Sequence, residues 1–296
     1  MLALSAPATA QDFAAPIDLP KGATIDLVIE KTKTEIREGK AQPTAGGTFR
    51  YRQTLTPDGD GYRVRQVMTD SSFMGGAKPS GQESQMLAAA SEVSYRADES
   101  LAPVEMLDWP ATVERLFGLI GKVDPDSSPD AMAQARKMFV DMGPALAAQV
   151  VLRQQNILAM PQALPMDLGE PIEEVQQVPN PLGGSPIDSV FRVELVSVDK
   201  AASRAVVRST QTLDPASANR SMRLMMDELT KRGTAKPSTV PDFRMERTIV
   251  CTYDMDTGSG LTAKADCLMK ATFAGGGETA ERTERDVITQ TLVSQP

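Results

Sequence analysis

The two cysteines are the residues whose spacing predicts the most specific chemistry. Cys251 and Cys267 flank residues 256–260, a run of Asp, Thr, Gly and Ser that is typical of a tight turn centred on Ser259. Two strands that fold back at this turn bring both sulfur atoms to one face of the hairpin. The same pairing places three further pairs opposite each other: Ile249 and Met269, Tyr253 and Ala265, and Met255 and Ala263.

A disulfide between Cys251 and Cys267 is therefore the favoured state of this pair. It would stabilise the fold by about 3 kcal/mol and would indicate an oxidising compartment. Two buried free thiols are an alternative. A redox-active pair is a weaker alternative, because such pairs usually have a C-x-x-C spacing, which is absent from this chain.

The chain contains no histidine, which removes the most common general base and the most common metal ligand. Nucleophiles of the Ser–His or Cys–His type and histidine-based zinc sites are therefore excluded. We favour a non-enzymatic protein without a cofactor. A carboxylate-based hydrolase is the remaining enzymatic alternative, although the paired carboxylates at residues 58 and 60 and at 254 and 256 fall in predicted turns.

A loop with alternating oxygen side chains is the only weak candidate for a metal site. Asp124, Asp126 and Asp130 have the spacing of the first ligands of a calcium loop. Prolines at positions 125 and 129 interrupt the pattern, and its sixth and twelfth positions lack glycine and glutamate. A capped loop between two helices explains these residues more simply, so no metal site is expected.

Composition excludes two classes of partner. The 39 acidic residues outnumber the 31 basic ones, giving a net charge of −8, and the charges are dispersed along the chain. We therefore expect no nucleic-acid partner, which would need a basic surface. No apolar run approaches the roughly 20 residues of a membrane helix, so no transmembrane segment is expected.

The first residues resemble the end of an export signal. Ala8, Thr9 and Ala10 form the small-x-small pattern that precedes a signal-peptidase cut, after a short run of small and apolar residues. We interpret residues 1–10 as a residual signal peptide and expect a periplasmic or secreted protein. The alternative is a disordered tail rich in Ala and Pro.

Strands with one apolar face dominate the first half of the chain. Residues 24–36 form one such strand, and residues 48–55 and 62–69 form a hairpin about a turn at 57–61, with Phe49 opposite Met68 and Leu55 opposite Tyr62. Residues 92–98 and 103–107 are shorter strands. Residues 81–90 form a predicted helix.

The second half repeats this order. Strands are predicted at 189–199 and 203–213, a helix at 217–231, the disulfide hairpin, and a final strand near 279–292. We therefore predict an α+β fold of curved, mainly antiparallel sheets, built from two degenerate hairpin–helix–hairpin repeats with a helical insertion between them. The predicted units are 11–109, 110–161 and 162–296.

The helical insertion is amphipathic and rich in methionine. Its helices cover 110–122, 129–142 and 144 to about 159, and a Pro/Gly-rich link at 160–186 follows. Methionines on flexible helices can line a pliable apolar groove, whereas ordinary core packing is the plainer alternative. The groove candidates are Met132, Met138, Phe139, Met142, Met222, Met225 and Met226.

Two Tyr-x-x-Asp hairpins, at 95–98 and 253–256, carry a family resemblance, together with the approach to the second sheet at 164–169 and the leader-like residues 8–10. The chain resembles uncharacterised exported β-rich proteins of Gram-negative bacteria. More distantly, its layout is similar to half-barrel lipoprotein carriers of the LolA type, in which a curved antiparallel sheet wraps helices over an apolar cavity. The resemblance covers most of the chain and assigns no functional residue.

These observations lead to two main functional hypotheses. The first is a periplasmic envelope protein that binds an apolar ligand such as a lipid between the sheet and the methionine-rich helices. The second is a protein–protein interaction module that docks on an envelope protein through the helical insertion.

Overall fold

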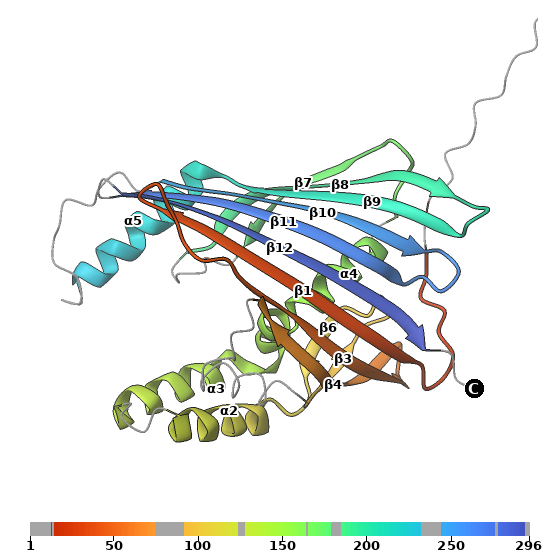
Figure 1. Cartoon of the computed structure of the whole chain (residues 1–296), viewed down its shortest axis with the longest axis horizontal. Coiled ribbons are helices and arrows are strands. Elements are labelled where there is room, and N and C mark those ends of the chain that lie inside the picture. Colours follow the sequence, from red (N-terminus) through yellow and green to blue (C-terminus); the bar gives the residue numbers. More distant parts are fainter. Residues whose placement is uncertain are drawn as a thin grey trace, which may run out of the picture.

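The computed structural model describes residues 13, 15–74, 92–123, 128–163, 165–178, 185–231, 244–275 and 278–293. Twelve strands in these ranges form one open, curved sheet (Figure 1). Its strand order is β6-β5-β4-β3-β1-β12-β11-β10-β9-β8-β7, with β2 paired to β1. Every pairing between these strands is antiparallel. The predicted α+β class with curved antiparallel strands and a helical insertion is confirmed.

The predicted elements that fall within the described residues appear in the predicted order. The strands of the first half are β1 (Thr24–Arg37), β2 (Lys40–Ala41), β3 (Ala45–Asp58), β4 (Gly61–Phe73), β5 (Glu92–Ala97) and β6 (Pro103–Met106). The insertion contains α2 (Trp109–Val123), α3 (Pro129–Val151), α4 (Arg153–Ala159) and the short helix η2 (Met160–Ala163). The second half contains β7 (Ile172–Val178), β8 (Ile187–Asp199), β9 (Arg204–Leu213), α5 (Pro215–Lys231), β10 (Arg244–Asp256), β11 (Thr262–Gly275) and β12 (Glu278–Val293).

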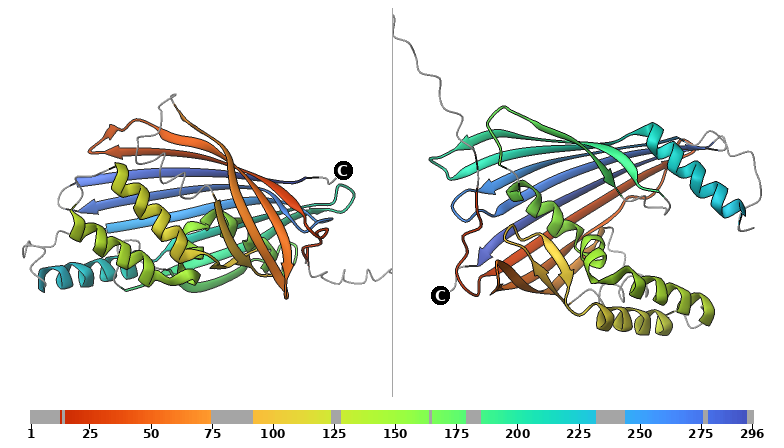
Figure 2. Two further views of the ribbon diagram at one scale, coloured as in Figure 1. Left: turned by 90° about the horizontal axis from the view of Figure 1, so that it is seen from below. Right: turned by 180° about the vertical axis from the view of Figure 1, so that it is seen from behind.

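The two half-sheets join in the middle of the sheet. β1 pairs with β12 along its whole length, from Thr24 opposite Val293 to Arg37 opposite Ala280. The outer edges of the sheet are therefore β6 and β7, which are neighbours in the chain. The segment between these strands has to pass from one edge to the other, and this is why the helical insertion lies across one face of the sheet (Figure 2).

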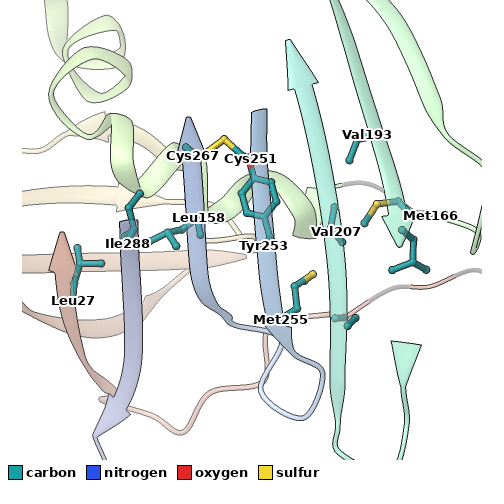
Figure 3. Close-up of a cluster of buried hydrophobic side chains, with 14 of the residues drawn as sticks. Leu27, Leu158, Met166, Val193, Val207, Cys251, Tyr253, Met255, Cys267 and Ile288 are labelled. Atoms are coloured by element: carbon teal, nitrogen blue, oxygen red, sulfur yellow. A yellow bond between two sulfur atoms is a disulfide. The ribbon is translucent and has the colours of Figure 1, made fainter. Parts of the chain in front are cut away.

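The two faces of the sheet differ in chemistry. The inner face, which we define as the face that contacts α4, carries Leu27, Tyr253 and Ile288, all buried (Figure 3). The outer face carries cross-strand ion pairs, such as Arg52 with Asp26 and Arg285 with Asp266. Because side chains alternate between faces along a strand, this division fixes the register of each strand.

Three clusters of buried side chains form the core. The first lies between α4 and the centre of the sheet, and includes Leu158 and the disulfide cysteines. The second lies between β4–β6 and the helices α2 and α3, and includes Trp109, whose Nε1 donates to the Phe139 carbonyl at 2.9 Å. The third is smaller and lies under α5, around Met245. The helices are thus held by separate parts of one sheet.

The disulfide hairpin has nearly the predicted register. Ile249 faces Met269, Cys251 faces Cys267 and Tyr253 faces Ala265. The predicted pairing of Met255 with Ala263 is wrong, because a bulge between Asp254 and Met255 places Met255 opposite Thr262. The bulge adds a residue near the turn without moving the cysteines.

The register of the first hairpin differs from the prediction by two residues. Leu55 faces Val64 and Tyr51 faces Met68, whereas Phe49 faces Ser71. The turn is tighter than predicted, because Asp58 pairs directly with Gly61 and Gly59 adopts a positive φ of 64°. A shift of two residues keeps the side chains between Tyr51 and the turn on their predicted faces, and a bulge between Arg50 and Tyr51 makes the shift three residues at Phe49.

Two strands were not predicted from the sequence, namely the two-residue β2 and the edge strand β7. β7 falls in the segment predicted as a Pro/Gly-rich link, and its Val175 is 75% exposed. Its sequence, IEEVQQV, lacks regular alternation because it forms an edge of the sheet. The predicted helix at 81–90 and the residual signal peptide at 1–10 lie outside the described residues.

An N-terminal segment closes one end of the inner face. Phe13 exchanges backbone hydrogen bonds with Met166 beside the first cluster, and the Asp18 amide donates to the Ser259 carbonyl at 3.0 Å. Ile17 and Leu19 pack against the second cluster. The segment therefore runs along the turn of the disulfide hairpin, at the end of the sheet where β1 begins (Figure 1).

Candidate ligand-binding face

The disulfide lies at the centre of the inner face. Cys251 and Cys267 are bonded with a Cα–Cα distance of 4.1 Å, and both are buried in the first cluster (Figure 3). The predicted bridge is confirmed. It links β10 and β11 at the boundary between the part of the inner face that α4 covers and the part that continues toward α5.

The methionines proposed to line a groove lie at two separate places. Met132, Phe139 and Met142 pack against the second cluster, whereas Met138 is 60% exposed on α3. The α5 residue Met222 is buried over β8 and β10, and α3 contacts β6 near the opposite edge. The side chains of Met225 and Met226 lie outside the described set. The structure therefore does not bring the described methionines of the insertion together with Met222.

The aspartates with metal-like or catalytic spacing occupy loops and turns. Asp130 is exposed in the first turn of α3, and residues 124 and 126 lie outside the described ranges. Asp256 organises its own turn by accepting hydrogen bonds from the Gly258 amide and the Ser259 hydroxyl, both at 3.0 Å. Within the described ranges, no group of three or more metal-ligating side chains is arranged to hold an ion.

The inner face changes from apolar to charged along the central strands. Ile29 faces Ile288, and the next inner positions pair Lys31 with Asp286, Lys33 with Glu284, and Glu35 with Arg282. We call these six charged residues the charged ladder. Within it, Lys31 Nζ lies 3.9 Å from Asp286, Lys33 Nζ lies 3.4 Å from Glu35, and Arg282 Nε donates to Glu284 at 2.8 Å. The ladder thus neutralises most of its own charge.

Beside the charged ladder, the inner face carries an apolar strip. It consists of Phe191 on β8, Ile249 on β10 and Met269 on β11, which lie in register with Gln211 of β9 between the first two. All three apolar side chains are partly buried, and Phe191 and Ile249 pack against the first cluster. Because none of the three is fully buried, the strip leaves some apolar surface open directly next to charged groups.

Arg247 is the unusual residue of this region. It lies on the inner face of β10 opposite Ala271, between Met245 and Ile249. Burial lowers the pKa of the Arg247 guanidinium, and the nearby positive charge of Arg153 at the start of α4 lowers that pKa further. In the described part of the chain, no carboxylate forms an ion pair with either arginine.

A buried polar network joins α4 to the first half-sheet. Gln53 Nε2 donates to Gln66 Oε1 at 2.9 Å and to the Tyr95 hydroxyl at 3.1 Å, and Gln155 Nε2 donates to the same Gln66 oxygen at 2.6 Å. Gln155 Oε1 has no partner in the described structure and faces a cavity of about 50 Å³. A cavity of this size suits water and is too small for a lipid.

The sequence contained signals for part of this face. Continuing the odd-numbered alternation of the disulfide hairpin backwards places Arg247 on the inner face, and the same rule places Lys31 and Lys33 there on β1. The full glutamine network had no such signal, because Tyr95 and Gln155 come from elements distant in the chain from the β3–β4 hairpin that carries Gln53 and Gln66.

The fold and this face define a β-rich protein with a single open sheet, a charged outer face and an amphipathic inner face. In the described part, no helix is long and apolar enough to cross a membrane. No protein-family model matches the chain, and no curated protein matches it.

Among solved structures, the chain is similar to one from a study of lipid–protein interactions in lipovitellin, with a TM-score of 0.48 and 7% identity over 94% of this chain. It spans 26% of the lipovitellin chain. It is also similar to OpdL of Pseudomonas aeruginosa, with a TM-score of 0.26 and 8% identity, over 92% of this chain and 99% of OpdL. DynF, from the dynemicin biosynthesis pathway of Micromonospora chersina, has a TM-score of 0.23 and 8% identity, over 97% of this chain and 87% of DynF. At these levels the likeness supports no inference about function.

Proposed function

We propose that this chain is a non-enzymatic envelope protein, periplasmic or secreted, that binds an apolar ligand such as a lipid on the inner face of its sheet. The observation that carries the proposal is the apolar strip. Phe191, Ile249 and Met269 lie in one row across β8, β10 and β11, with Gln211 of β9 between the first two, and they are only partly buried after α4 and α5 have packed. A row of apolar side chains that keeps part of its surface open to solvent is a feature of binding sites.

The dimensions of the apolar strip suit an extended chain. Phe191 and Met269 lie on β8 and β11, which are three strand spacings apart. At about 4.8 Å per spacing, the strip crosses roughly 14 Å of the sheet. An acyl chain laid across the strands would cover all three side chains and remove their apolar surface from water.

Two observations support an oxidising compartment. Cys251 and Cys267 form a disulfide, and such bonds persist mainly outside the cytosol. The small-x-small sequence at residues 8–10 is consistent with export. The resemblance to exported β-rich proteins and to lipoprotein carriers agrees with a location outside the cytosol and with an apolar ligand.

The test compares one substitution on each face of β10. Ile249→Gln places an amide in the apolar strip, whereas Val250→Gln changes the next residue, which is 37% exposed on the outer face. The neutral probe N-phenyl-1-naphthylamine reports binding by fluorescence. We expect Ile249→Gln to weaken probe binding at least fivefold, because burial of the apolar contact is lost, and Val250→Gln to leave it unchanged.

Melting curves show whether both variants remain folded. Equal probe binding by wild type and a folded Ile249→Gln variant would reject the strip as the site. Mass spectrometry of gently purified wild-type protein should in addition find a co-purifying lipid, and lipid-free protein that also fails to bind the probe would reject the function.

A second candidate function is docking of an envelope protein on α3. Four of its apolar side chains are strongly exposed, namely Met138, Val140, Leu146 and Val150. Removing the whole insertion is an unsuitable test, because Ala147 and Leu158 belong to the core. A photocrosslinking residue at position 138 should instead capture one envelope protein in cells, while the same residue at the exposed Gln149 serves as control. Equal or absent capture at both positions would reject docking here.

A further inference from the structure

Arg247 is placed where an unpaired charge is unfavourable. Its cross-strand partner is Ala271, its inner-face neighbours along β10 are the buried Met245 and the partly buried Ile249, and Phe273 faces Met245. A guanidinium among apolar side chains loses hydration without an ionic contact to replace it. The position therefore favours a ligand that brings a negative charge.

The acidic residues of the inner face are already engaged. Glu284 accepts from Arg282, Asp286 lies by Lys31, and Glu35 lies by Lys33 and Arg37. Arg247 lacks an ion pair with a described carboxylate, and in this respect it differs from the ion-paired arginines of the outer face. Partner carboxylates raise the pKa of Arg52 and of Arg285, whereas the pKa of Arg247 is lowered.

The charged neighbour of Arg247 is also a cation. Arg153 begins α4 and is exposed, and its positive charge lowers the pKa of Arg247. Two such like charges repel each other unless an anion lies between them. The chain as a whole carries a net charge of −8, so a pair of arginines without a carboxylate is a local exception to its overall charge.

We propose that Arg247 binds the anionic headgroup of an amphiphile whose apolar tail lies on the strip formed by Phe191, Ile249 and Met269. This inference rests on the proposed function and adds the chemical class of the ligand. Ile249 connects the two parts, because it is two residues from Arg247 on the same face of β10.

Carboxylate and phosphate groups share the recognition chemistry. A guanidinium donates two parallel hydrogen bonds to the oxygens of either group. A fatty acid, an acidic phospholipid and free inorganic phosphate all present these oxygens. The apolar strip next to Arg247 favours an amphiphile, since free phosphate would leave that surface exposed.

The experiment uses two ligands that differ only in the headgroup. Oleate and oleyl alcohol are titrated into the full chain, and each displaces N-phenyl-1-naphthylamine. Wild-type protein should bind oleate about tenfold more tightly than the alcohol. Arg247→Gln should abolish this preference and keep the affinity for the alcohol.

Arg244→Gln is the matched control, because Arg244 lies on the same strand with its side chain exposed on the outer face. It should behave as wild type. Equal affinity of wild type for oleate and oleyl alcohol would overturn the headgroup site and leave apolar binding intact. An equal loss of affinity for both ligands in Arg247→Gln would show that Arg247 has a structural role, and this result would also overturn the headgroup site.

A separate measurement keeps the anion site testable if neither amphiphile binds. The melting temperature is then compared in inorganic phosphate and in chloride at equal ionic strength. Stabilisation by phosphate that is lost in Arg247→Gln but kept in Arg244→Gln would support an anion site at Arg247. Together with the absence of amphiphile binding, that result would reject the proposed lipid-binding function but not the anion site. Equal stabilisation of all three proteins would overturn the anion site.

Discussion

Tyr95 and Tyr253 occupy equivalent places in the two half-sheets. Each is buried on the inner face, opposite Val64 on β4 and Val207 on β9 respectively, and each lies three residues before the Asp of a tight turn. Each hydroxyl is hydrogen bonded to a polar side chain of another strand. This correspondence supports the repeat that the two Tyr-x-x-Asp sequences predicted.

The tyrosine hydroxyls should contribute to stability. The Tyr253 hydroxyl and the Ser209 hydroxyl are 3.2 Å apart and buried. Tyr253→Phe should lower the free energy of unfolding by about 1 kcal/mol, because it leaves the Ser209 hydroxyl without its partner. Urea denaturation measures the change. Adding Ser209→Ala should recover part of the loss, and strictly additive losses would contradict the hydrogen bond.

The same tyrosine predicts a loss of stability in base. Burial raises the pKa of Tyr253 from its ordinary value of 10.0 to about 12. The folded state therefore holds the Tyr253 proton more tightly than the unfolded state does. The stabilisation of the folded state that results is complete below pH 10 and is lost as the pH rises toward 12. The loss should reach roughly 2 kcal/mol. Urea unfolding between pH 9 and about 11.5 should show a shallower decline for Tyr253→Phe than for wild type, and parallel declines would contradict the prediction.

Gly260 should tolerate no side chain because the N-terminal segment crosses it. Its φ is +74°, and an added Cβ would lie 2.2 Å from the Pro16 carbonyl oxygen. Gly59 also has a positive φ, of +64°, but nothing lies near its Cβ position. Gly59→Ala should therefore cost only about 1 kcal/mol of backbone strain.

Gly260→Ala should cause the same backbone strain and should also displace the N-terminal segment that packs over the turn. The free energy of unfolding should therefore fall by about 3 kcal/mol in total. Thermal or urea unfolding of both variants gives the difference. Equal destabilisation by the two substitutions would show that the N-terminal segment does not stabilise the fold.

The disulfide should stabilise the fold without being required for its topology. Replacing Cys251 and Cys267 together by alanine should lower the free energy of unfolding by about 3 kcal/mol. The β10–β11 ladder continues on both sides of the bridge, so circular dichroism should still show the sheet. Loss of the sheet signal in the double variant would mean that the bridge is needed for folding.

Alternation of apolar and polar residues was sufficient to predict most strands and their faces. It identified the disulfide hairpin because two cysteines and a glycine-containing turn fixed one register. It failed at β7, where an exposed edge strand has no buried face to alternate with. It also misplaced the first hairpin, since two registers separated by two residues bury the same side chains and only the turn geometry distinguishes them.

The candidate binding face was less predictable than the fold. The methionines suggested a groove between the sheet and the methionine-rich helices, but the described ones are divided between α3 and α5, which pack on distant strands. The isolation of Arg247 depends on which residues of other strands and of α4 lie around it. Sequence patterns along one strand cannot supply that information.

The pairing of β1 with β12 has a consequence for biosynthesis. β12 follows every other described strand in the chain, yet it occupies the middle of the sheet. Until β12 emerges, β1 and β11 both present unpaired backbone amides and carbonyls to water and to other chains. The protein thus reaches its native sheet only after the late arrival of one central strand, and a growing or translocating chain would need shielding from aggregation during that interval.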